Sequence, residues 1–186
     1  LVPEERPDIG VIEQRIERFG LTLKAGRDFD VINPEDDPRY RDYVELFHSL
    51  VGRKGVTPDT ARTIVRTNTT VIGALAVKRG EADALICGLQ GRFIKHARNI
   101  QSVIGLAEDS QQLSALSMLV MTRGVFFLAD TYVNIDPSAD EIVSITLQAR
   151  DHLKRFNIDA KAALLSYSNF GSREGATSEK MRLVYE

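Results

Sequence analysis

Two kinds of apolar pattern alternate along the chain, and this alternation constrains the fold more than any other feature of the sequence. One kind has the spacing of an amphipathic helix, as in residues 38–51 and 138–156. The other is a short continuous apolar run of the type found in buried strands, as in residues 84–87 and 125–129. Helices that alternate with buried strands indicate a layered α/β architecture.

The same reading along the chain predicts where each element lies. Residues 125–129, 138–156 and 161–166 read as strand, helix and strand, which predicts a parallel, right-handed βαβ crossover. The short Arg123-Gly124 link indicates a hairpin between strands 116–121 and 125–129. The full set of expected helices is 9–19, 38–51, 71–78, 93–104 and 138–156, with further helix starts at Thr57 and Thr177, and the other expected strands are 29–32 and 84–87.

Charge and cysteine content exclude several classes of protein. With 24 Lys and Arg against 26 Asp and Glu the net charge is −2, which argues against a dedicated nucleic-acid-binding protein. No apolar run approaches the length of a membrane-spanning helix, so we expect no membrane association. The single cysteine, Cys87, rules out an internal disulfide, and its apolar strand suggests a small core residue in a protein of the cytoplasm. Because the chain lacks a starting Met and its last residues continue a helix, we expect it to be part of a longer protein.

Ligands of open α/β sheets bind beyond the carboxyl ends of strands, so three such ends are candidate sites. Residues 166–172 combine three serines with an asparagine and a glycine, and such hydroxyls and backbone N–H groups can cradle a phosphate or another oxyanion. An ordinary polar loop has the same composition, since Ser, Asn and Gly are common turn formers. The spacing matches neither a Walker loop nor a nucleophile elbow.

The other two strand ends also carry polar side chains. Asp130 and Thr131 follow one strand, where an acid can orient a ligand or simply cap a turn. The segment 88–98 places Arg92, Lys95 and Arg98 around a helix start, which suits an anionic ligand but also an ordinary solvated face. No set of His, Cys, Asp and Glu residues has the spacing of a metal site, so we predict no metal here.

Several motifs together resemble one family. The stretch from Val125 through Asp130 and the Leu165-Ser-Tyr-Ser-Asn-Phe-Gly-Ser172 element resemble phosphate acetyltransferases and butyryltransferases, over roughly residues 40–186. Within that family, Cys87-Gly-Leu-Gln-Gly-Arg-Phe93, His96 and the segment 168–173 look like the C-terminal domain of bacterial hybrid NADP-dependent malic enzymes. No dinucleotide fingerprint occurs in this chain, so the dehydrogenase part lies elsewhere in such a protein.

The resemblance implies a three-layer αβα, two-lobed phosphotransacetylase-like fold, related to isocitrate and isopropylmalate dehydrogenases. Residues 1–136 would form the first lobe and 137–186 the beginning of the second, through which a homo-oligomer assembles. Arg98 falls where the family places a phosphate-contacting arginine, although a threonine-rich approach is replaced here by residues 92–96. The residues expected to bind acyl-CoA or phosphate are Arg92, Lys95, Arg98, Asp130, Thr131, Ser166, Ser168, Asn169, Gly171 and Ser172.

Two functions follow from this resemblance. The first is a regulatory domain that binds acetyl-CoA, within a malic enzyme whose NADP and Mg²⁺ or Mn²⁺ are held by a separate domain. The alternative is a working phosphate acyltransferase, whose C-terminal Ser-Arg and Asp would lie beyond Glu186. A domain kept only for oligomerisation is a third possibility. No catalytic residue is assigned in this chain.

Overall fold

The computed structural model describes residues 9–108, 110–169 and 172–186. Within that part the chain forms two compact units. One contains the residues up to Leu89 together with Ser102–Ile104, and the other contains Gln90–Gln101 and the residues from Gly105 onward. The lobe boundary expected at 136/137 stays a prediction.

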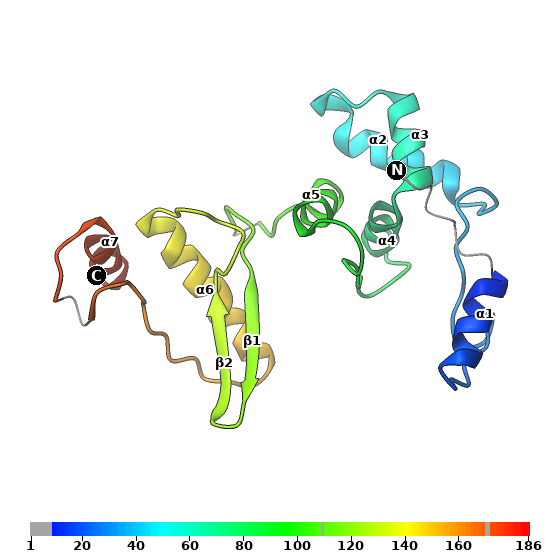
Figure 1. Cartoon of the computed structure of the whole chain (residues 1–186). Coiled ribbons are helices and arrows are strands. Elements are labelled where there is room, and N and C mark those ends of the chain that lie inside the picture. Colours follow the sequence, from blue (N-terminus) through cyan, green and yellow to red (C-terminus); the bar gives the residue numbers. More distant parts are fainter. Residues whose placement is uncertain (1–8, 109, 170–171) are drawn as a thin grey trace. The chain divides into compact units, whose positions relative to one another are not determined.

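The first unit is helical and is built around one apolar helix. It contains α1 (Ile9–Arg18), α2 (Tyr40–Val51), the 3-10 turn η1 (Gly52–Lys54), α3 (Pro58–Thr67) and α4 (Thr69–Lys78) (Figure 1). Because α4 is apolar around its circumference, it packs against both α2 and α3 and provides five of the twelve core residues. The buried core side chains are Tyr43, Val44, Phe47, Val51, Ala61, Val65, Val71, Ile72, Ala74, Leu75, Ala76 and Val103.

Local signals in the sequence explain where these helices begin and end. The Thr57 side chain accepts a hydrogen bond from the Thr60 N–H, and Pro58 follows it as the first helical residue of α3. Asn68 caps α4 in the same way by accepting from the Val71 N–H. Gly80 has φ +73°, a left-handed conformation that favours glycine, and it follows the end of α4. The expected helices over 38–51 and 71–78 and the helix start at Thr57 are therefore confirmed.

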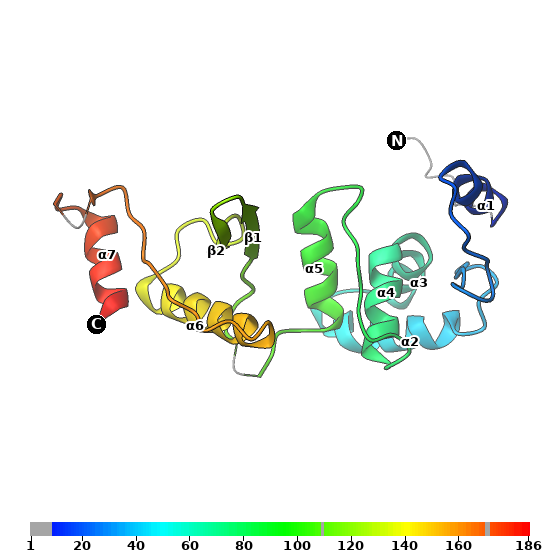
Figure 2. The same ribbon diagram turned by 90° about the horizontal axis from the view of Figure 1, so that it is seen from below.

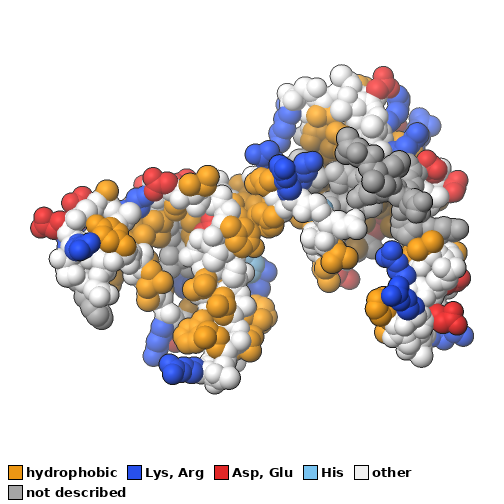
Figure 3. Space-filling model, in the orientation of Figure 1, with side chains coloured by type: hydrophobic (Ala, Val, Ile, Leu, Met, Phe, Trp, Pro, Cys, Tyr) orange, Lys and Arg blue, Asp and Glu red, His pale blue; other side chains and the backbone are white. Residues whose placement is uncertain are grey.

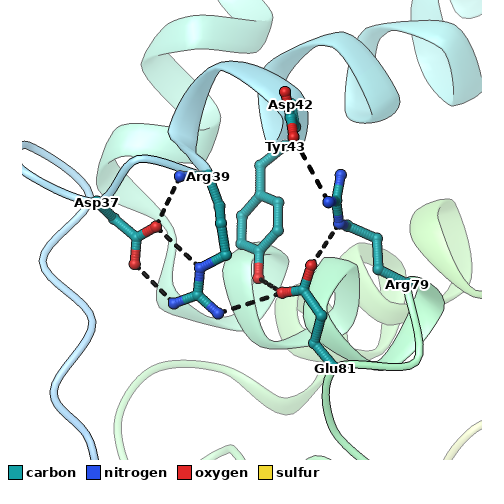
Figure 4. A network of polar contacts seen from close by, with 6 residues as sticks. All are labelled: Asp37, Arg39, Asp42, Tyr43, Arg79 and Glu81. Carbon is teal, nitrogen blue, oxygen red and sulfur yellow. Dashed lines mark hydrogen bonds and ion pairs between the residues drawn. The ribbon is translucent and has the colours of Figure 1, made fainter.

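A polar network joins the start of α2 to the turn after α4 (Figure 4). The Tyr43 hydroxyl donates to Glu81, while Arg39 pairs with both Asp37 (2.7 Å) and Glu81 (3.3 Å). The Arg79 guanidinium donates to the other oxygen of Glu81. Burial, followed by the hydrogen bond to Glu81, raises the pKa of Tyr43 to about 12. These contacts fix segments almost forty residues apart, and no motif in the sequence signals them.

The second unit contains the sheet. It includes most of α5 (Phe93–Val103), then β1 (Leu116–Met121), β2 (Gly124–Ala129), α6 (Ala139–Arg155) and α7 (Ala176–Tyr185). The two strands pair antiparallel, from Leu116 opposite Ala129 to Met121 opposite Gly124, so the expected hairpin is confirmed. The helix α6 runs alongside this hairpin in both ribbon views and contacts β2 (Figures 1 and 2). Among the described residues, no helix combines the length and apolar character needed to cross a membrane.

The hairpin exposes apolar side chains on both of its faces. Val120 is 74% exposed on one face, and Phe126 is 50% exposed on the other. Figure 3 shows hydrophobic side chains gathered over the two strands on the side in view. An antiparallel strand with one solvated face alternates apolar and polar residues, whereas strands covered on both faces are apolar throughout. The hairpin has the second pattern.

Three expected strands do not form. Residues 84–87 and 161–166 have no regular secondary structure, and Phe29 makes only an isolated bridge to Ala25. The predicted βαβ crossover is therefore wrong for the described residues, and Cys87 is exposed rather than part of the core. The physical reason is that a buried strand needs a neighbouring strand that supplies hydrogen bonds. In the described part of the chain, only β1 and β2, which are adjacent in sequence, pair with each other.

Candidate ligand-binding site

The segment before α5 forms a tight loop that folds back on the helix. Gly91 has φ +91°, a conformation that favours glycine. The His96 Nε2 lies 2.6 Å from the Gln90 carbonyl oxygen. A Cβ added at Gly91 would lie 3.2 Å from the same Nε2, so the imidazole occupies the space that glycine leaves. His96 on the first turns of α5 therefore holds the loop in which this candidate site begins.

The cations of this segment are exposed and lack carboxylate partners. Among the described residues, none forms an ion pair with Arg92, Lys95 or Arg98. The first turn of α5 also contains no acidic residue. Because the N-terminus of a helix carries partial positive charge, cations placed there are unfavourable unless an anion accompanies them. The positive potential at the start of α5 is thus available to an anionic ligand.

The loop after β2 is organised by the carboxylate of Asp130. Its Oδ1 accepts hydrogen bonds from the N–H groups of Ala115 (3.0 Å) and Val133 (3.3 Å). Its Oδ2 accepts from the N–H (2.8 Å) and the side-chain amide (2.6 Å) of Asn134. Burial raises the pKa of Asp130, but these hydrogen bonds together lower it below its ordinary value. Asp130 is an ionised group that ties both open ends of the hairpin together.

One aromatic contact brings this loop to the start of α5. The rings of Phe93 and Tyr132 meet edge to face, with centroids 4.8 Å apart. Thr131, the neighbour of Tyr132, lies with its hydroxyl 3.1 Å from the Ser117 hydroxyl on β1. The structure therefore joins the segment that carries Arg92, Lys95 and Arg98 to the one that carries Asp130 and Thr131.

The third predicted segment forms a separate serine-rich turn. The Ser168 N–H donates to the Ser166 hydroxyl (3.2 Å), and the buried Ser168 hydroxyl accepts from the Arg173 N–H (2.9 Å). Asn169 and Ser172 are exposed, and the Ser172 N–H donates to the Asn169 carbonyl. Gly171 lies outside the described residues. Within the described ranges, no hydrogen bond or ion pair connects this turn to the other two segments.

The sequence interpretation omitted the residues that connect the segments. Phe93, Tyr132 and Asn134 were not among the predicted site residues, although each lies beside one of them. The sequence does single out the two aromatic residues, because each stands next to polar residues at a predicted strand end, where a large apolar side chain is unexpected. Asn134 carries no such signal, since its contact with Asp130 depends on how the loop folds.

Two cavities flank α6, and neither is lined by any predicted site residue that the structure describes. The second has a volume of about 400 Å³ and lies against Leu113, Ala115, Gln148 and His152. Within the residues that the structure describes, no cluster of His, Cys, Asp and Glu has the arrangement of a metal site. The polar loops, rather than these cavities, carry the candidate chemistry.

Comparisons with known proteins agree on a single family. The family model described as "Phosphate acetyl/butaryl transferase" matches residues 9–186. The NAD-dependent malic enzyme of Rhizobium meliloti is 56% identical over 97% of this chain, and the NADP-dependent malic enzyme of Haemophilus influenzae is 44% identical over 95%. The phosphate acetyltransferase of Haemophilus influenzae is 31% identical over 86% of the chain.

These relatives are much longer than the chain, which spans 23% of either malic enzyme and 22% of the acetyltransferase. Among solved structures, the EutD phosphotransacetylase from Staphylococcus aureus matches with a TM-score of 0.76 at 19% identity, covering 96% of this chain and 54% of that one. The expected α/β, phosphotransacetylase-like fold is thereby confirmed.

Proposed function

The chain belongs to the phosphate acetyl/butaryl transferase family, and on this premise we propose that it is an acetyl-CoA-responsive regulatory and oligomerisation domain of a malic enzyme. The identity of 56% to one malic enzyme, against 31% to a phosphate acetyltransferase, supports a malic enzyme as the parent. The parent would decarboxylate malate oxidatively to pyruvate. Its NADP and its Mg²⁺ or Mn²⁺ would bind outside these residues.

The observation that carries this proposal is the set of unpaired cations at the start of α5. Acetyl-CoA carries several phosphate groups, and Arg92, Lys95 and Arg98 are exposed side chains without carboxylate partners in the described part of the chain. A guanidinium presents a planar fork of donors that matches a phosphate, and a lysine adds a mobile point charge. The three side chains would therefore neutralise the phosphates of the ligand.

The other predicted residues receive supporting roles. The serine-rich turn, with Ser166, Ser168, Asn169 and Ser172, would hold the acyl end through hydroxyl and N–H donors. Thr131 offers a hydroxyl at the edge of the β2 loop. Because Asp130 accepts its hydrogen bonds from Ala115 and from Val133 and Asn134 of its own loop, its role in the proposal is to hold Thr131 in place. No residue is assigned to proton transfer or nucleophilic attack.

Regulation requires that acetyl-CoA binds two states of the parent with different affinities. The test is malate oxidation by the full-length protein, measured with and without acetyl-CoA. We expect acetyl-CoA to lower the rate, and the Arg92→Ala/Lys95→Ala variant to need a higher concentration for the same effect. Lys161→Ala, which removes another exposed cation of the same unit, serves as the matched control. A wild-type rate that does not respond to acetyl-CoA would remove the proposal.

The second candidate is catalysis by the domain itself, which the family match supports. A phosphate oxygen would attack the thioester carbonyl of acetyl-CoA, the C–S bond would break, and coenzyme A would leave as a thiolate. Cationic side chains and N–H donors would stabilise the oxyanion that forms. Acetyl phosphate formed by the full-length protein from acetyl-CoA and inorganic phosphate would establish this activity, and its absence would exclude it.

We also propose that the parent is a cytoplasmic homo-oligomer, as the family resemblance implies. Deleting these residues from the full-length protein should then reduce its mass in solution, measured by light scattering. An unchanged mass would place the oligomer contacts in another part of the protein.

A further inference from the structure

The contact between Phe93 and Tyr132 is unusual in its exposure. The two rings meet at an interplanar angle of 88°, the geometry of aromatic pairs in protein cores. Here, however, Phe93 is 47% exposed and Tyr132 is 59% exposed. A large part of both rings therefore faces solvent, where apolar surface is unfavourable.

The loop that carries Tyr132 is held in place by the hydrogen bonds described above. Asp130 fixes the N–H groups of Val133 and Asn134, which follow Tyr132 directly, and Thr131 contacts Ser117 before it. The backbone on both sides of Tyr132 is therefore anchored. A ring presented by an anchored loop loses little conformational freedom when a ligand binds to it.

Two cations flank Phe93 in the chain. Arg92 directly precedes Phe93 in the chain, and Lys95 follows within the first turn of α5. Neither forms an ion pair within the described residues. The start of α5 thus brings together exposed aromatic side chains and exposed cations, and a ligand that satisfies both has a flat aromatic group bonded to phosphates.

We infer that Tyr132 and Phe93 form a platform for the adenine ring of acyl-CoA, while Arg92 and Lys95 contact the phosphates on the adjoining ribose. This inference rests on the proposed function and deepens it, because it assigns the nucleotide end of the ligand to the start of α5. Acetyl phosphate carries a phosphate but no base, so the platform distinguishes the two ligands. Stacking of a base on an aromatic side chain changes affinity by roughly tenfold.

The test is isothermal titration of the full-length protein with acetyl-CoA, adenosine 3′,5′-bisphosphate and acetyl phosphate. Tyr132→Ala should weaken the binding of acetyl-CoA and of adenosine 3′,5′-bisphosphate roughly tenfold and leave the affinity for acetyl phosphate unchanged. Tyr132→Phe, which keeps the ring, should bind as the wild type does, and Tyr132→Leu should behave as Tyr132→Ala does. Tyr185→Ala, which removes an exposed tyrosine of α7, is the matched control.

The outcomes separate this inference from the proposed function. If acetyl-CoA slows malate oxidation but Tyr132→Ala and Tyr132→Leu bind it normally, the platform is wrong and the function stands. If the bisphosphate binds through Tyr132 but acetyl-CoA leaves malate oxidation unchanged, the platform stands and the regulatory function falls. Tighter binding of adenosine 2′,5′-bisphosphate, the half of NADP that carries adenine, would contradict the assignment to acyl-CoA.

Discussion

Replacing Asp130 by Asn tests whether the β2 loop is held by a charged acceptor. The substitution keeps the size of the side chain but leaves one oxygen for four donors: the N–H groups of Ala115 and Val133, and both nitrogens of Asn134. The new amide NH₂ must then face two of those donors. A hydrogen bond to a charged group contributes roughly 1.5–3 kcal/mol, and an unsatisfied donor costs a similar amount.

The expected loss follows from the half-buried position of the site. Asp130→Asn loses two charge-assisted hydrogen bonds, and their energy is reduced because the site is partly exposed to water. We therefore expect the substitution to lower the free energy of unfolding by about 2 kcal/mol at pH 7. For a chain of this size that corresponds to a fall of about 6 °C in melting temperature. Urea denaturation followed by circular dichroism measures the loss. Asp159→Asn, at an exposed carboxylate of the same unit that has no partner among the described residues, is the control.

The pH dependence of stability provides a second, independent test of this prediction. Hydrogen bonds lower the pKa of Asp130 in the folded state below its ordinary value of 3.8. Stabilisation by this group is therefore complete above the pKa of the unfolded state and is lost as the pH falls through the lower, folded-state pKa. The difference between wild type and Asp130→Asn should shrink when the pH is lowered from 7 to 3. A difference that stays constant over that range, or is absent at pH 7, would refute the account.

The remaining predictions concern the core, a helix cap and the polar network. Leu75→Ala should lower the free energy of unfolding, measured in urea, by about 3 kcal/mol because Leu75 is fully buried. Leu183→Ala, at an exposed position, should lower it by less than about 0.5 kcal/mol. Ser138→Ala removes one half of the capping box of α6 and should cost about 1 kcal/mol in thermal unfolding, which an unchanged midpoint would contradict. Glu81→Gln should lower the pKa of Tyr43, now about 12, in an alkaline absorbance titration, because the carboxylate raises it.

Helices were predictable from the sequence because their signals are local. The cap at Ser138 and the proline after Thr57 act within one helical turn, and the structure begins helices at both places. The hairpin was predictable for the same reason, since its two strands are joined by a two-residue turn. The polar network around Glu81 was not predictable, because it joins residues whose proximity depends on how α2 packs against α4.

The candidate site was predictable only at the level of its segments. Strand ends and clusters of like charge are visible in the sequence, so Arg92, Lys95 and Arg98 could be recognised there as a cationic group. Which polar residue faces a ligand and which faces its own loop is decided by hydrogen bonds that form after folding. Asp130 is an example. Its position at a strand end suggested a ligand contact, but in the structure its carboxylate accepts four hydrogen bonds from Ala115, Val133 and Asn134.

The absence of the expected strands and the exposed faces of the hairpin have the same physical cause, which is the lack of neighbouring strands in the described residues. Residues 84–87 and 162–165 are short apolar runs as β2 is, yet each lacks a neighbouring strand within the described residues. An isolated two-stranded hairpin is only marginally stable in water, and three or more strands with covered faces are needed for independent stability. The matched phosphotransacetylase has about as much chain again, since this chain covers 54% of it. An apolar run in the sequence therefore predicts the capacity to form a strand, while pairing depends on residues distant in the chain that cover both faces.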